Sequence, residues 1–145
     1  MSDTNYESVK DQILAFLKEF NWEPISVTEK EGLYTIVLVA DLDIKQVNIQ
    51  IKFSETSHWV YFSSIFLPSI QKNQTEIYRK LLEINYATTM TKFGMSPQGN
   101  VYALIEFPLK SMQYSEFISA LRRLTNDLNK FLLPIASLLA EEKPE

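Results

Sequence analysis

The stretch from Lys45 to Phe53 alternates strictly between polar and apolar residues. Val47, Ile49, Ile51 and Phe53 fall on one parity, and Gln46, Asn48, Gln50 and Lys52 fall on the other. A period of two predicts a β-strand with one buried and one solvated face. The flanking links, "DLD" and "SETS", are short. Parallel neighbours need a crossover of about a dozen residues, so this strand belongs to an antiparallel sheet.

Other segments fit the same sheet or cover it. Residues 25–67 contain further strand-like runs around a turn at Lys30-Glu31-Gly32, and two more runs flank "SPQGN", whose Pro and Gly favour a type I turn with a glycine bulge. Helical periodicity covers about residues 4–20, 73–86 and 113–140, and Pro134 predicts a kink or a stop in the last helix. The predicted fold is α+β, an antiparallel sheet with helices packed on it, in the order α-ββββ-α-ββ-α. We expect a single α+β domain over residues 1–140, followed by a frayed acidic tail over residues 141–145.

The junction "LLEINYATTMTKFGM", Leu81 to Met95, passes from helical spacing into a Thr-rich, β-branched segment. Asn tolerates the left-handed conformation that often ends helices. We therefore expect Asn85 to lie at the end of the helix, with a purely structural role.

The residues needed for most catalytic chemistry are scarce in this chain. It has no Cys, one His (His58) and three Gly, which excludes thiolate chemistry, Gly-rich phosphate loops and dinucleotide fingerprints. If the protein were a hydrolase that uses carboxylates, Glu106 would be the best candidate for its catalytic acid. With a net charge of −4 and no apolar run of transmembrane length, we expect no nucleic-acid partner, no membrane span and a soluble cytoplasmic protein. We predict no enzyme activity, no catalytic residue, no cofactor and no metal.

Two sets of apolar residues are candidate binding surfaces. The C-terminal run "LLPIASLLA" is apolar on more than one side, so Leu133, Ile135, Leu138 and Leu139 are a candidate protein interface. Alternatively, Trp59, Tyr61 and Phe131 line a small-ligand pocket between the sheet and the last helix. Packing into the chain's own core is the competing explanation for both sets.

Three segments, "LLEIN", "KFGMSPQGNVYALIEFPL" and "EFISALRRLTNDLNKFLLPI", carry a family likeness. They resemble the YbjN-type family, relatives of the type III secretion chaperones, with Leu81, Leu82 and Asn85 matching a Leu-Leu-x-x-Asn element and Pro108 a strand-ending proline. Phe107 departs from the usual Leu before that proline. Cyanobacterial proteins of similar length look similar too.

The resemblance implies a secretion-chaperone-like fold, frequent homodimers and no known catalytic residues. We therefore expect a non-enzymatic protein-binding module, chaperone-like or an adaptor, acting as a homodimer with an unidentified protein partner. The alternative is a small-molecule-binding domain with the apolar pocket between sheet and C-terminal helix.

Overall fold

The computed structural model describes residues 2–110 and 112–140, with side chains from Tyr6 onward. Three helices and six strands alternate in the predicted order: α1 (Ser2–Glu19), β1 (Ser26–Lys30), β2 (Leu33–Asp41), β3 (Gln46–Ser54), β4 (Trp59–Leu67), α2 (Gln74–Ala87), β5 (Lys92–Met95), β6 (Val101–Pro108) and α3 (Tyr114–Ala140). The α+β fold expected from the sequence is confirmed. The predicted acidic tail, residues 141–145, lies outside the described residues.

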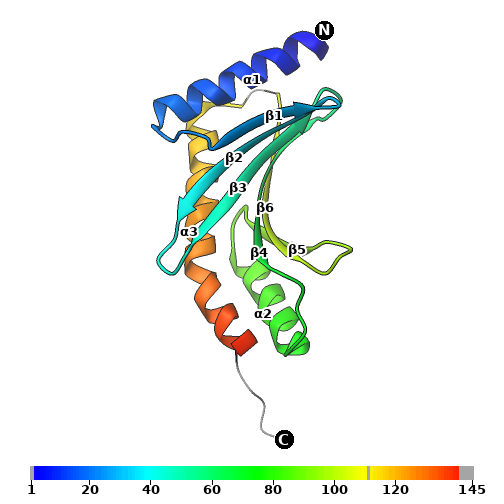
Figure 1. Cartoon of the computed structure of the whole chain (residues 1–145), viewed down its shortest axis with the longest axis vertical. Helices are drawn as coiled ribbons and strands as arrows, with labels where there is room; N and C mark the ends of the chain where they lie inside the picture. Colours follow the sequence, from blue (N-terminus) through cyan, green and yellow to red (C-terminus); the bar gives the residue numbers. More distant parts are fainter. Residues whose placement is uncertain (1, 111, 141–145) are drawn as a thin grey trace, which may run out of the picture.

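The strands form one antiparallel sheet in the order β1-β2-β3-β4-β6-β5 (Figure 1). The first four strands lie in the sheet in the order in which they occur in the chain, because only short turns join them. At the turn before β2, Glu31 and Gly32 both have positive φ (52° and 77°), as a tight two-residue hairpin turn requires. The chain then leaves the sheet to form α2, and the β5–β6 hairpin returns to pair β6 with β4.

One face of the sheet carries the core. The alternating apolar residues of β3 pair in register with those of β2, for example Ile51 with Ile36, and all are buried. Helix α3 covers this face, where Phe117 meets Phe62 edge to face with ring centroids 5.3 Å apart. Helix α1 covers it near Phe53, which contacts Tyr6 of that helix. Burying a side chain of this size stabilises the fold by roughly 1.5–3 kcal/mol.

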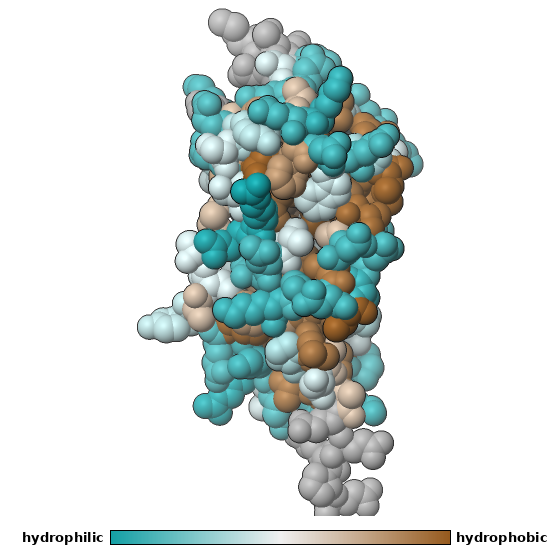
Figure 2. Space-filling view, turned by 90° about the vertical axis from the view of Figure 1, so that its left-hand side faces the viewer, coloured by the Kyte–Doolittle hydropathy of each residue, from teal (hydrophilic) through white to brown (hydrophobic). Residues whose placement is uncertain are grey.

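The opposite face of the sheet has no described helix over it. Trp59, Tyr61 and Ile65 of β4 point to this side and are exposed, alternating with the buried Val60 and Phe62. Figure 2 views the molecule from the side of α3 and the β2–β3 hairpin, and shows an interrupted apolar band along one edge with hydrophilic side chains over most of the rest. An antiparallel sheet with one open face is a common arrangement.

Helix α3 continues through Pro134 to Ala140, so of the kink or stop expected at this proline, the stop is absent from the described helix. Proline removes only one backbone donor, and Ile135 just after it is fully buried in the core. The far end of α3 lies beside α2 (Figure 1), where the Asn73 side-chain amide donates to the carbonyl of Leu138. Tertiary packing thus holds the last turns of the helix in place.

Candidate functional site

The described part of the chain offers no metal centre and no helix able to cross a membrane. No group of three His, Asp or Glu residues lies close enough to hold a metal ion there. None of the described helices is long and apolar enough to span a bilayer. Glu106, the best carboxylate for a hydrolase, lies exposed on the open sheet face and forms an ion pair with Lys92. It is therefore not a buried acid in a cleft.

A cleft opens between the N-terminal helix and the turn that joins β3 to β4. We call it the α1 cleft. Its volume is about 690 Å³, and its lining comes from three distant segments: Tyr6, Ser8, Val9 and Gln12 of α1; Ser54, Glu55, Thr56, Ser57, His58 and Trp59 around the turn; and Pro108, Leu109 and Lys110 after β6. Apolar side chains and hydroxyl, amide and charged groups are interspersed in this lining. Such a mixture suits binding by burial with a few orienting hydrogen bonds.

Local hydrogen bonds fix the walls of the α1 cleft. The hydroxyl of Ser57 donates to the Trp59 carbonyl (2.6 Å) and accepts the Trp59 N–H (3.0 Å), which shapes the turn. The N–H of Leu109 donates to the carbonyl of His58 (2.9 Å) and joins the third segment to the turn. On the helix side, the Gln12 side chain donates to the Met112 carbonyl (2.9 Å). The cleft is therefore built into the fold.

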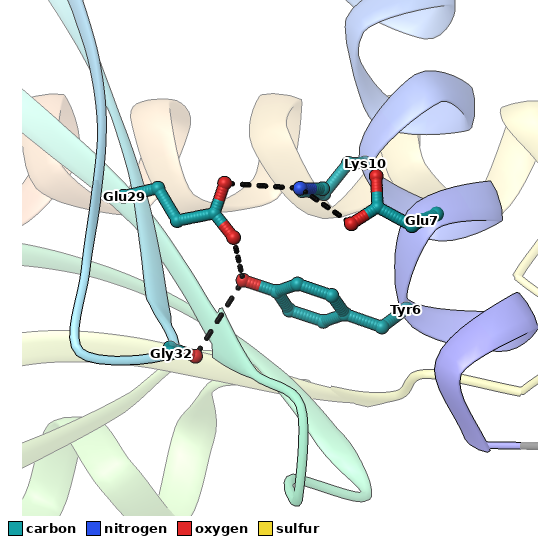
Figure 3. A network of polar contacts seen from close by, with 5 residues as sticks. All are labelled: Tyr6, Glu7, Lys10, Glu29 and Gly32. Carbon is teal, nitrogen blue, oxygen red and sulfur yellow. Dashed lines mark hydrogen bonds and ion pairs between the residues drawn. The ribbon is translucent and has the colours of Figure 1, made fainter.

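A polar network attaches α1 to the β1–β2 hairpin behind the cleft (Figure 3). The Tyr6 hydroxyl donates to Glu29 Oε1 (3.1 Å) and lies 3.5 Å from the Gly32 carbonyl. Lys10 Nζ lies 3.0 Å from Glu29 Oε2 and 2.9 Å from Glu7 Oε1. Its ammonium also sits 4.8 Å from the centre of the Tyr6 ring. Together these contacts hold Tyr6, a wall of the cleft, in one position.

The network shifts the pKa values of Tyr6, Lys10 and Glu29 in consistent directions. Burial, and then the hydrogen bond with Glu29, raises the pKa of Tyr6 to about 12. The bond from Lys10, followed by that from Tyr6, lowers the pKa of Glu29. Hydrogen bonds to Glu7 and Glu29 raise the pKa of Lys10. At neutral pH Tyr6 is therefore a neutral phenol, Lys10 an ammonium and Glu29 a carboxylate, which are the charge states that their contacts need.

The structure does not bring Trp59, Tyr61 and Phe131 together. Trp59 and Tyr61 are exposed on the open sheet face, whereas Phe131 packs against Phe93 from the helix-covered side (centroids 6.3 Å apart). The sheet separates them, so these three residues line no common pocket. Trp59 alone lies at a cavity, as part of the α1 cleft.

The C-terminal stripe is mostly used by the chain's own core. Ile135 is fully buried, and Leu138 and Leu139 are half-buried against the core. Leu133 alone of the four is broadly exposed, at 55%. The interface of these four residues stays a prediction; Leu133 is the member that is broadly exposed, whereas the other three pack wholly or partly against the chain's own core.

A second apolar surface was not foreseen from the sequence. Leu82 (70% exposed) and Tyr86 (95%) project from α2, and Met95 (56%) lies on neighbouring β5. The pair Leu81-Leu82 contained the signal: on a helix two adjacent leucines cannot both face one core, and Leu81 is the buried one.

Asn85 does not end α2, and the expectation that it would is wrong. The helix continues to Ala87. The Asn85 side chain instead pairs with the outer edge of β5: its Oδ1 accepts the Phe93 N–H (2.8 Å) and its Nδ2 donates to the Phe93 carbonyl (3.1 Å). One amide thus takes the place of a neighbouring strand and fastens α2 to the sheet.

The fold is that of the secretion chaperones. The chain is similar to a chain in the structure of the HopA1–SchA chaperone–effector complex, with TM-score 0.64, 13% identity, and 91% and 96% of the two chains covered. The chain is also similar to a chain of the ExsC–ExsE complex, with TM-score 0.60 and 15% identity, and the match covers 84% of this chain and 92% of the other. A chain of the heterodimeric ExoU–SpcU complex from the type III secretion system of Pseudomonas aeruginosa is similar with TM-score 0.58 and 12% identity, and the match covers 83% of this chain and 94% of the other. At such identities the likeness concerns the fold alone.

A family model identifies the family of this chain from its sequence. The model of the YbjN family, described as "Putative bacterial sensory transduction regulator", matches residues 10–132. The chain therefore belongs to the YbjN family. A comparison with curated proteins finds none that matches the sequence.

Proposed function

We propose that this protein is a non-enzymatic, chaperone-like binding module that holds a segment of a partner protein in the α1 cleft. One of the solved structures of similar fold is, by its own description, a chaperone–effector complex, and the other two are described as complexes of two proteins, which supports a protein partner. Regulation through such binding is in keeping with the description of the family. We place this activity in the cytoplasm.

The α1 cleft carries the proposal. It is about 690 Å³ in volume, and its lining combines the apolar Val9, Trp59 and Leu109 with the polar Ser8 and Gln12. A partner segment in the cleft buries one or two apolar side chains there and makes hydrogen bonds at the rim. A folded client must first unfold locally to place an extended segment in the cleft, and this costs more than ordering a segment that is already disordered, so we expect an unfolded segment to be the preferred ligand.

The small-ligand alternative moves to the same cleft. Its volume falls within the range of about 300–1,000 Å³ that is usual for small-molecule sites. A small ligand and a partner segment would occupy the same cleft and compete for it. Binding of a small molecule and binding of an unfolded protein must therefore each be measured in the absence of the other.

The test is the binding of a permanently unfolded protein. Fluorescently labelled, reduced and carboxymethylated α-lactalbumin is titrated with the protein, and its anisotropy is followed. The wild type is expected to bind saturably. Ser8→Arg places a long charged side chain at the cleft from an exposed helix position, and we expect it to weaken binding by about tenfold or more, that is at least about 1.4 kcal/mol.

Ser119→Arg is the matched control. Ser119 is exposed on α3 and does not line the cleft, so the same change there is expected to leave the affinity unaltered. Equal weakening by both variants, or no binding by the wild type, contradicts the proposal. Saturable binding of a small apolar molecule, with none of the unfolded protein, favours the alternative.

We further propose that the module works as a homodimer. The support is the amount of apolar side chain that the single chain leaves exposed away from the cleft, including Leu82, Tyr86 and Leu133.

A further inference from the structure

The α1 cleft has opposite charges toward its two ends. Among its lining residues, Glu55, His58 and Lys110 have ionisable groups that are charged or can become so, and all three are exposed. Within the described residues, neither Glu55 nor Lys110 forms an ion pair. Both charges are therefore available to a molecule that enters the cleft.

The negative end lies beside Tyr6. The N–H of Glu55 donates to the carbonyl of Gly32 (3.3 Å), and the Tyr6 hydroxyl lies 3.5 Å from the same carbonyl (Figure 3). A Cβ built on Gly32 would lie 4.0 Å from the carboxyl carbon of Glu55, so the carboxylate itself is at this turn. Burial and then Glu29 are the main causes of the raised pKa of Tyr6, and the charge of Glu55 adds to them.

The positive end lies further along the same helix. The N–H of Leu109 donates to the carbonyl of His58 (2.9 Å), and Lys110 follows directly. Two residues later, the carbonyl of Met112 accepts a hydrogen bond from the Gln12 side chain (2.9 Å). These two bonds place Lys110 at the part of the cleft next to Gln12.

Between its two ends the cleft is lined by apolar side chains. Val9 lies between Tyr6 and Gln12 on α1, and Trp59 and Leu109 come from the other two segments. At 1.5 Å per residue, Tyr6 and Gln12 are about 9 Å apart along the helix. An extended chain rises about 3.3 Å per residue, so a ligand needs about three residues or more to reach both ends. A free amino acid, with both charges on one carbon atom, is too short.

We propose that the α1 cleft selects an extended partner segment in which a basic and an acidic side chain flank an apolar one. The basic side chain approaches Glu55, the acidic one approaches Lys110, and the apolar one covers Trp59. Side chains two residues apart point to the same side of an extended segment, so the pattern basic-x-apolar-x-acidic, in either chain direction, presents all three to the cleft. This assignment rests on the proposed function and names the class of segment that the cleft takes.

The experiment is an NMR titration of the full chain with four heptapeptides. The first, acetyl-Gly-Arg-Ser-Leu-Ser-Glu-Gly-amide, carries the proposed pattern, and its blocked ends add no charge. The other three replace its Arg and Glu by two Gln, by two Arg or by two Glu. Dissociation constants come from the saturable shifts of the backbone amide signals of the cleft residues.

The wild type is expected to bind the Arg/Glu peptide most tightly, about threefold to tenfold more tightly than the Gln/Gln peptide, because two exposed ion pairs contribute modestly. This preference is expected to shrink below about twofold in about 1 M salt, where the Debye length is about 3 Å.

Charge reversal tests the two ends one at a time. Glu55→Lys makes both ends positive and should bind the Glu/Glu peptide most tightly, whereas Lys110→Glu should favour the Arg/Arg peptide. Glu23→Lys and Lys72→Glu are the matched controls, because both positions are exposed and lie outside the lining. Both controls are expected to keep the wild-type order of affinities.

Three results would overturn the proposal. The first is equal affinity of the wild type for the Arg/Glu and Gln/Gln peptides, or no saturable shift with any peptide. The second is tightest binding of the Arg/Arg peptide by the wild type, which attraction to a chain of net charge −4 would give by itself. The third is the same reversal of preference in the controls. None of these decides whether unfolded α-lactalbumin binds in the cleft, so charge selection can fail while the proposed function stands.

Discussion

Replacing Asn85 with Ala tests whether one side-chain amide fastens α2 to the sheet. The change removes two hydrogen bonds to the backbone N–H and carbonyl of Phe93, a residue that is only 7% exposed. Each bond contributes about 0.5–1.5 kcal/mol net, and a backbone group left without a partner costs about 1–3 kcal/mol. Water can reach part of the vacated edge, so the low end of that range applies, giving about 2–3 kcal/mol for both groups.

Helix propensity acts in the opposite direction. Asn85 lies inside α2, where Ala is more favourable by up to about 0.7 kcal/mol. The expected net loss in the free energy of unfolding is therefore about 2 kcal/mol. Urea denaturation measures it as a lower midpoint with an unchanged slope.

The control for this prediction is Asn126→Ala. Asn126 is exposed on α3, so the same substitution changes only propensity and is expected to be neutral or slightly stabilising. Hydrogen exchange adds a local readout, because the Phe93 amide should exchange faster in Asn85→Ala. If Asn85→Ala matches Asn126→Ala in stability and the Phe93 amide stays protected, the strand-like role of Asn85 is refuted.

Three further changes test other parts of the fold. Asp127 is 7% exposed with an unpartnered buried Oδ2, so Asp127→Ala, which removes that oxygen and favours the helix, should raise the free energy of unfolding by about 1 kcal/mol, and a lower melting temperature would contradict this. The folded state raises the pKa of Tyr6 to about 12, above the ordinary value near 10. The stabilisation that Tyr6 provides is therefore complete below pH 10 and is lost as the pH rises toward 12. Urea unfolding between these pH values should show a steeper fall in the free energy of unfolding for the wild type than for Tyr6→Phe. Gly99 has φ +89°, and a Cβ there would lie 3.1 Å from Ser69 Oγ, so Gly99→Ala should cost about 1–2 kcal/mol in urea unfolding, whereas Gly94→Ala, with its nearest neighbour at 3.5 Å, should be nearly neutral.

The strands and their order along the chain could be predicted because their signals are local. The alternation around Ile49 and Ile51 fixes which residues share a face, and short turns fix which strands pair. Gly99 has the positive φ expected of its turn. The extent of α3 agrees with the helical periodicity over about residues 113–140, but the sequence left open whether the helix stops at Pro134, because the burial of Ile135 that offsets the local cost of proline is a tertiary effect.

The candidate sites depend on tertiary arrangement and were harder to predict. Trp59 and Tyr61 alternate with buried residues along β4 and share one face, but such alternation does not say which face α3 covers. The α1 cleft combines residues near positions 6–12, 54–59 and 108–110, and no local pattern links those segments. The pairing of Asn85 with Phe93 likewise depends on how α2 meets the edge of β5.

The most direct test of the proposed function uses the chain's single histidine. His58 lines the α1 cleft, so its imidazole gives one set of NMR signals at the site in question. Unfolded, carboxymethylated α-lactalbumin is titrated into the wild type and into Ser8→Arg. Binding in the cleft predicts a saturable shift of the His58 signals in the wild type that is strongly reduced in the variant. If the unfolded protein binds while the His58 signals stay unmoved, the partner segment does not occupy this cleft.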